Sequence, residues 1–278
     1  MHTSICDAPH YTPHAGTDQC AGECYHARQK TAPHKGLTMG LLFEEIDSQP
    51  SPIGEISLRR RRIPALGERD IYEVKLGDEF LMSSMFYDAE IALADLGLAA
   101  VSGEALAVVV GGLGLGYTAV AALKDQRVSE LLIVDYLDTV IRWHQQEKVP
   151  LGKELNADPR SRYVHGSFFD MAVEPGGGFD PQAPGRLFDA ILLDIDHSPR
   201  ALLHHGNASF YTVANLGLMA GQLRSGGVFA LWSQDPPDAD FMPVMEQVFI
   251  NTAAHIIPFF NPFQNGEATN TIYVGVKA

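Results

Sequence analysis

The chain has 278 residues, of which 46% are apolar and 19% are charged. This composition supports one large domain with a packed core, or one domain with a small appendage, and excludes a globally disordered chain. Acidic residues outnumber Lys and Arg by 34 to 20, so the formal charge is −14. We therefore exclude a general nucleic-acid binder and a peripheral membrane protein held by basic residues, because both need clustered Lys and Arg.

One segment could be mistaken for a membrane span. Residues 105–123 contain no charge, and roughly 20 apolar residues are enough to cross a bilayer. Four glycines interrupt the middle of this segment, so a strand, a turn and a helix explain it better. Three cysteines are too few for a disulfide scaffold, and the N-terminus lacks the pattern of a secretory signal. We expect a soluble, cytoplasmic protein.

Residues 1–36 differ in character from the rest of the chain. They contain all three cysteines and five of the eleven histidines, and they have neither helical nor strand periodicity. We expect a flexible tail. The alternative is a metal site around Cys20 and Cys24, but structural zinc usually needs two closely spaced ligand pairs, and one CxxxC is a weak signal. We assign no metal ligand.

Residues 37–86 predict a small β-domain. Three candidate strands, at residues 53–58, 71–76 and 79–84, are separated by turn signals such as Gly77-Asp78. Residues 59–62 are four consecutive arginines. A charge run of this kind is usually a solvated strand or loop, and the alternative is a clamp for an anionic group.

Residues 87–278 predict an α/β domain. Apolar residues at helical spacing indicate a helix over residues 88–99, and short apolar strands then alternate with helices. This alternation indicates a parallel sheet buried on both faces, and two late strands indicate a hairpin at its edge. The predicted strands are residues 105–110, 131–134, 163–165, 190–193, 228–232, 254–258 and 271–276, and the predicted helices are residues 117–123, 139–146 with Asp138 as N-cap, 210–223 and 241–249.

The strongest local signal is the glycine turn after the strand at residues 105–110. Gly112, Gly114 and Gly116 give the spacing GxGxG, whereas dinucleotide-binding proteins have GxGxxG. Such a turn lets a ligand approach backbone N–H groups and a helix N-terminus. The observed spacing fits a nucleoside without a pyrophosphate, such as S-adenosylmethionine, and the alternative is a tight turn with no ligand.

Two further acids suggest how a nucleoside would be held. Asp135 follows Gly116 by 19 residues at the end of the second strand of the domain, where a carboxylate can accept both ribose hydroxyl protons. Asp170 follows the third strand and is a candidate to accept from the adenine amino group. The alternative for Asp135 is an ordinary residue of a turn at the end of a strand.

The fourth strand ends in Asp194, Asp196 and His197. Open parallel sheets bind ligands beyond the carboxyl ends of their strands. We predict that Asp194 binds an amine and accepts its proton, supported by Asp196 and His197. Tyr87 and Tyr211 are predicted to wall the acceptor pocket. The alternatives are an Asx turn with a helix cap for the acids, and a half-buried helix residue for Tyr211.

From residue 53 onward the chain resembles the spermidine synthase (polyamine aminopropyltransferase) family, within the class of S-adenosylmethionine-dependent methyltransferase folds. The segments that carry the resemblance are residues 70–74, 81–84, 110–116, 188–194, 210–211 and 223–228. The resemblance implies an α/β, Rossmann-like fold: a seven-strand, mostly parallel sheet with helices on both faces and a C-terminal hairpin, after a small N-terminal β-domain. It also implies a homodimer.

Four departures separate this chain from that family. The family's glycine loop reads GGGDGG, whereas residues 111–116 contain no acid. The second acid after the fourth strand, Asp196, is shifted by one position. The family's Gly-Asp pair after the third strand is Gly166-Ser167 here. The tyrosine and acid at the entrance helix are matched only approximately by Tyr87, Asp88 and Glu90.

The missing loop acid leads us to favour methyl transfer from S-adenosylmethionine to a small nucleophile, by preference an amine. The alternative is aminopropyl transfer from decarboxylated S-adenosylmethionine. Both are displacements at a carbon next to a sulfonium, in which the protein supplies positioning and a base. A second alternative is a non-catalytic binding module whose Cys/His tail binds metal.

Overall fold

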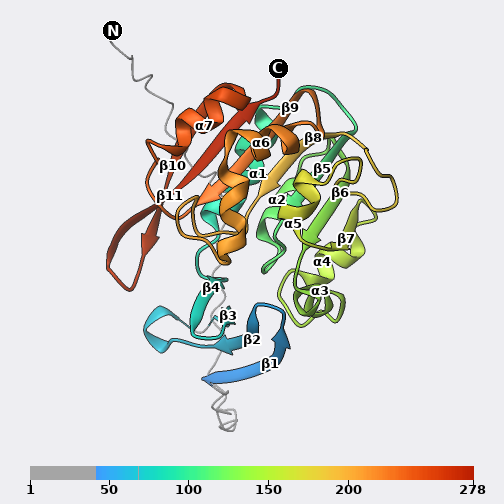
Figure 1. The fold of residues 1–278 in the computed structure, drawn as a ribbon. Coiled ribbons are helices and arrows are strands. Elements are labelled where there is room, and N and C mark those ends of the chain that lie inside the picture. The colour runs from blue at the N-terminus through green and yellow to red at the C-terminus, as the bar shows by residue number, and fades with distance from the viewer. Residues whose placement is uncertain (1–41, 68) are drawn as a thin grey trace, which may run out of the picture.

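A computed structural model describes residues 42–67 and 69–278, which form two sheets in this part of the chain. The predicted tail, the CxxxC sequence and the metal-binding alternative lie outside the described residues. The first sheet is antiparallel, with strand order β1-β2-β3-β4. Its strands are β1 (Phe43–Ser51), β2 (Gly54–Arg61), β3 (Ile71–Leu76) and β4 (Glu79–Ser83), with the short 3-10 helix η1 (Pro64–Leu66) between β2 and β3. Figure 1 shows this small sheet apart from the main body.

The second sheet has seven strands in the described residues, in the order β10-β11-β9-β8-β5-β6-β7. Neighbouring strands from β9 to β7 run parallel, and the hairpin β10-β11 adds antiparallel strands beside β9. The strands are β5 (Leu106–Gly111), β6 (Val128–Asp135), β7 (Ser161–His165), β8 (Phe188–Leu193), β9 (Leu223–Ser233), β10 (Ile250–Asn261) and β11 (Gly266–Val276). The predicted Rossmann-like fold class is confirmed.

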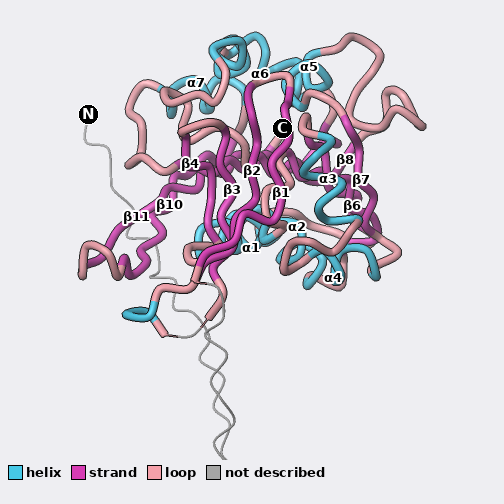
Figure 2. Tube along the Cα trace, turned by 90° about the horizontal axis from the view of Figure 1, so that it is seen from below, coloured by secondary structure: helices cyan, strands magenta, loops and turns pink. Residues whose placement is uncertain are grey.

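Helices cover both faces of this sheet (Figure 2). Each face has its own apolar core. One face carries α1 (Asp88–Ala99), α2 (Tyr117–Lys124), α3 (Asp138–Gln145) and α4 (Gly152–Ala157). The other face carries α5 (Phe168–Val173), the 3-10 helix η2 (His205–Tyr211), α6 (Val213–Ala220) and α7 (Phe241–Val248). The continuous apolar strands β5 and β8 lie in the middle because both of their faces are covered.

Several local predictions differ from the structure. Strand β1 was not predicted, because its acids hide strand periodicity; Glu44 and Glu45 pair with arginines of β2. The helix predicted over residues 210–223 is two shorter elements, since the Thr212 side chain caps a new helix, α6. The prediction of Asp138 as N-cap was wrong: it is the first residue of α3, and the N-cap is Leu137. Helices α4 and α5 were also missed.

The small sheet is fastened to the main domain by Asp47 of β1. Its Oδ2 accepts from Nε1 of Trp143 at 2.9 Å and from Nζ of Lys148 at 2.8 Å. The four arginines at residues 59–62 lie at the end of β2 and pair with Glu45, Glu44, Glu73 and Asp70. The arginine run therefore forms ion pairs on a solvated strand, which is the first of its two sequence interpretations. The helices of the described residues are too short or too polar to span a bilayer.

Candidate active site

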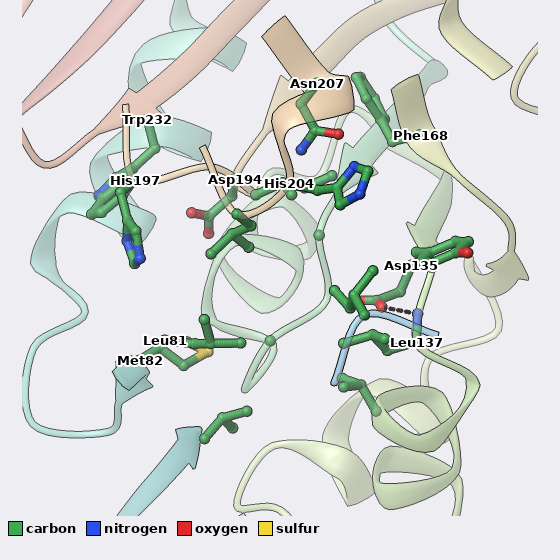
Figure 3. Close-up of a pocket in the computed structure, with 18 of the residues that line it drawn as sticks. Leu81, Met82, Asp135, Leu137, Phe168, Asp194, His197, His204, Asn207 and Trp232 are labelled. Carbon is green, nitrogen blue, oxygen red and sulfur yellow. Dashed lines mark hydrogen bonds between the residues drawn. The ribbon is translucent and has the colours of Figure 1, made fainter. Parts of the chain in front are cut away.

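A cavity of about 640 Å³ opens where the small sheet meets the carboxyl ends of the large sheet's strands (Figure 3). Four carboxylic acids line it, and its described lining contains no Lys or Arg. The acids are Glu90, Asp135, Asp170 and Asp194. Aromatic rings form much of the remaining wall, including Phe80, Phe86, Phe168, Phe169, Trp232 and Phe259. The cavity is thus acidic, and its aromatic walls offer faces on which a cation or a planar ring can rest.

The glycine loop follows β5 and packs directly against the segment after β8. The Asp194 N–H donates to the Gly111 carbonyl at 2.8 Å. A Cβ atom at Gly112, whose φ is +92°, would collide with the carbonyl oxygen of Asp194. Glycine is therefore required at residue 112 for the close approach of two backbones. Gly112 and Gly114 both line the cavity, whereas the α2 N-cap Gly116 packs against His144 and Leu155.

Asp135 ends β6 and faces this loop. Its two carboxylate oxygens accept the backbone N–H groups of Leu113, at 2.8 Å, and Leu137, at 2.7 Å. Burial raises the pKa of Asp135, and these two N–H groups oppose the rise. Each carboxylate oxygen has a further lone pair, so the side chain can still accept from two hydroxyls. This arrangement fits the predicted contact with ribose.

Asp194 and Glu90 form a pair of acids at the other end of the loop. Oδ2 of Asp194 accepts from the Thr118 hydroxyl at 2.8 Å. Burial raises the pKa of Asp194 to about 6, although the bond from Thr118 opposes the rise. Burial first, and then the charge of Asp194, raise the pKa of Glu90 well above its usual range. Such a pair keeps one carboxyl protonated until a cation arrives.

Asp196 and Tyr211 bind each other and lie away from the cavity lining. Asp196 is 1% exposed and accepts from the Tyr211 hydroxyl at 2.8 Å, from the Leu203 N–H at 2.8 Å and from Nδ2 of Asn207 at 2.9 Å. Neither side chain lines the cavity. Asp196 instead anchors the loop that brings His204 and Asn207 to the cavity wall. The support to catalysis predicted for Asp196 and the acceptor contact predicted for Tyr211 stay predictions.

The other predicted residues are spread around the cavity. His197 lines it and contacts Oε1 of Glu79 through Nε2 at 3.0 Å, which joins the small sheet to the segment after β8. Asp170 is exposed at the start of α5 and lines the cavity too. Tyr87 lies outside the lining and stacks on Tyr117, with ring centroids 4.5 Å apart.

Sequence reasoning missed three contributors to the site. Glu90 was predicted only as an approximate family match, although it is an acid between the apolar neighbours Ala89 and Ile91 in α1, and that signal could have identified it. Thr118 and Met82 carry no such signal. Their importance depends on contacts with Asp194 and with the glycine loop, which come from distant parts of the chain.

The strand order, the glycine loop after β5 and the acids at the ends of β6 and β8 define a Rossmann-like α/β protein with an acidic cavity at the carboxyl ends of its strands. No protein-family model and no curated protein matches the sequence. Similar solved structures include the spermidine synthase of Thermotoga maritima, with a TM-score of 0.63 and 18% identity. A spermidine synthase in complex with the transition-state analogue AdoDATO gives a TM-score of 0.63 and 17% identity. In both cases the match covers 84% of this chain and 72% of the other. The chain therefore has the spermidine synthase fold, as the resemblance implied.

Proposed function

We propose that this protein transfers an aminopropyl group from decarboxylated S-adenosylmethionine to an amine acceptor. One observation carries the proposal: the half-buried pair Glu90 and Asp194 lies in a cavity whose described lining has four acids and no Lys or Arg. Negative charge on these acids stabilises a sulfonium or an ammonium group in the cavity. The α-carboxylate of intact S-adenosylmethionine would face like charges without a cationic partner.

The residues present fit a sulfonium nucleoside. Asp135 retains lone pairs for the ribose hydroxyls. Phe168 and Phe169 offer apolar faces to a base beyond β7, where Asp170 is also exposed. The nucleoside would supply an electrophilic carbon next to a positively charged sulfur.

The chain's own groups account for the remaining chemistry. Glu90 and Asp194 bind the acceptor as an ammonium ion. Asp194 then accepts a proton from this ion and frees the nitrogen lone pair. The nitrogen–carbon bond forms as the carbon–sulfur bond breaks, and the sulfur keeps the bonding electron pair as a neutral thioether. Thr118 holds the Asp194 carboxylate in place throughout.

The comparisons favour this reaction over the methyl transfer that the sequence suggested. The similar solved structures are named spermidine synthases, and one contains a transition-state analogue. Methyl transfer from S-adenosylmethionine remains the second candidate, because Gly114 carries no acid to hold an aminopropyl ammonium group. The acceptor is a small molecule in both cases. A homodimer in the cytoplasm stays a prediction.

The product nucleoside tests the proposal and separates the two candidates. The full-length protein is incubated with a panel of amines and either decarboxylated or intact S-adenosylmethionine. Aminopropyl transfer releases 5′-methylthioadenosine, whereas methyl transfer releases S-adenosylhomocysteine. We expect amine-dependent 5′-methylthioadenosine from the wild type and none from Asp194→Asn. Amine-dependent S-adenosylhomocysteine alone would show that the second candidate is correct.

A further inference from the structure

Met82 of β4 reaches from the small sheet to the glycine loop of the main domain. Its Sδ atom accepts the backbone N–H of Leu115 at 3.0 Å. A Cβ atom at Gly114 would collide with the same sulfur. Met82 also lines the cavity, and Figure 3 shows its sulfur at the cavity edge beside Leu81. A neutral thioether thus occupies the place where a side chain at residue 114 would lie.

Four of the five backbone N–H groups at residues 112–116 have hydrogen-bond partners. Gly112 donates to the Val134 carbonyl at 2.9 Å, Leu113 donates to Asp135 at 2.8 Å, Leu115 donates to Met82 at 3.0 Å, and Gly116 donates to the Leu113 carbonyl at 2.7 Å. A carboxylate is normally received at such a loop by free N–H groups next to a helix N-terminus. Among residues 112–116 only the Gly114 N–H has no such partner, and the Met82 sulfur lies beside that residue.

Among those partners, Met82 is the one that does not belong to the glycine loop or to β6. Asp135 and the carbonyl groups of Leu113 and Val134 hold the loop's own turn together. Met82 can be changed without breaking those bonds. It is therefore the side chain that decides whether the Leu115 N–H, two residues before α2, is open to a ligand.

We propose that Met82 is a specificity-determining residue that excludes sulfonium nucleosides bearing an α-carboxylate from the glycine loop. This inference rests on the proposed function and names the structural feature that selects its substrate. The sulfur does so in two ways. It takes the N–H group that a carboxylate would need, and its bulk closes the space beside Gly114. A decarboxylated nucleoside has no carboxylate, so it needs neither the Leu115 N–H group nor the space beside Gly114.

The test measures how the full-length protein discriminates between two ligands. Wild type, Met82→Ala and Met82→Leu are titrated calorimetrically with intact and with decarboxylated S-adenosylmethionine. 5′-Methylthioadenosine, which carries neither a carboxylate nor an ammonium group, serves as the reference ligand. Met85→Ala is the control variant, because Met85 is buried three residues further along and does not line the cavity.

We expect the wild type to bind the decarboxylated form more tightly. Met82→Ala should raise the affinity for the intact form relative to the decarboxylated form by about tenfold, since a freed N–H then meets a carboxylate. Met82→Leu keeps the bulk and should retain most of the discrimination. Binding of 5′-methylthioadenosine should change by no more than about twofold in any variant.

The outcomes separate this inference from the proposed function. The inference is wrong, and the proposed function stands, if the decarboxylated form binds and Met82→Ala has the same ratio of intact to decarboxylated affinity as the wild type. If the wild type binds none of the three nucleosides, both are wrong. Should Met82→Ala fail to fold, Met82→Val provides the same test, because its shorter side chain does not reach the Leu115 N–H.

Discussion

The Thr118 hydroxyl donates to Oδ2 of Asp194 over 2.8 Å and so joins the first turn of α2 to the end of β8. Both residues follow the glycine loop in the sequence, and the bond joins segments that are 76 residues apart. The bond leaves the other oxygen of Asp194 available to a ligand. It also favours the ionised form of a carboxyl whose pKa burial raises to about 6.

The first prediction concerns the pH dependence of turnover. Asp194 can accept a proton only when it is ionised, so activity should fall as the pH drops through about 6. Thr118→Val removes a bond to the ionised form and should move this acidic limb to higher pH. Thr139→Val, the same change at a buried site in α3 outside the cavity, should leave the limb in place. A pH–rate profile of the three proteins measures the shift. An unshifted limb in Thr118→Val would mean that Asp194 is not the titrating group.

Glu90 should act on acceptor binding more than on turnover. Glu90→Gln removes one of the two charges that hold the ammonium ion, and we expect KM for the amine to rise about tenfold or more with a smaller change in kcat. Asp95→Asn is the matched control, since Asp95 is exposed on the same helix outside the cavity. Equal KM values in Glu90→Gln and wild type would exclude Glu90 from the acceptor site.

The same pair predicts a proton release. An arriving ammonium ion stabilises both ionised carboxyls, so the proton retained by Glu90 must leave. Amine titrations in two buffers of different ionisation enthalpy should report release of up to one proton near neutral pH, and no release in Glu90→Gln. Identical heats in the two buffers for the wild type would contradict this account of the pair.

Asp135 should control nucleoside affinity. Asp135→Asn places an amide where two backbone N–H groups and the ribose need acceptors, and we expect a loss of about 100-fold in nucleoside binding. Asp138→Asn, three residues further along, half-buried and outside the cavity lining, should bind normally. A titration with 5′-methylthioadenosine measures the difference. Binding by Asp135→Asn within about threefold of the wild type would remove Asp135 from the site.

The sulfur of Met82 and a side chain at residue 114 should be mutually exclusive. Gly114 has a φ of +46°, which Asp tolerates better than most residues, but its Cβ would meet Met82. We expect Gly114→Asp alone to lower the melting temperature, and Met82→Ala with Gly114→Asp to recover it. A double-mutant cycle of thermal unfolding measures this coupling. Additive effects would show that the two positions do not compete for space.

Asp47 should stabilise the attachment of the small sheet. Hydrogen bonds from Gln49 and Lys148 hold the pKa of Asp47 below its usual range. Its stabilising effect is therefore present above the usual carboxyl pKa of about 4 and is lost as the pH falls below it. Asp47→Ala should cost about 2 kcal/mol of unfolding free energy at pH 7, partly because the buried Trp143 N–H loses its acceptor. Asp78→Ala, exposed in a turn of the same sheet, is the control; equal denaturant midpoints would contradict the prediction.

The fold was largely predictable because its strong signals are local. The apolar strand at residues 105–110 and the glycine turn after it need no partner to be recognised, and α1 was predicted with its observed bounds. Strand β1 was missed because its acids are explained only by the arginines of β2. Met82 and Thr118 were missed for the same reason: their roles arise from contacts that no short window of sequence contains.

The most direct test of the central claim is the affinity of the wild-type protein for two nucleosides. Calorimetric titration with decarboxylated S-adenosylmethionine, and separately with the intact form, compares ligands that differ only in the α-carboxylate. An acidic cavity without Lys or Arg in its described lining, next to a loop whose Leu115 N–H is bound by Met82, predicts tighter binding of the decarboxylated form by about tenfold or more. Equal or tighter binding of the intact form would contradict the account and support methyl transfer.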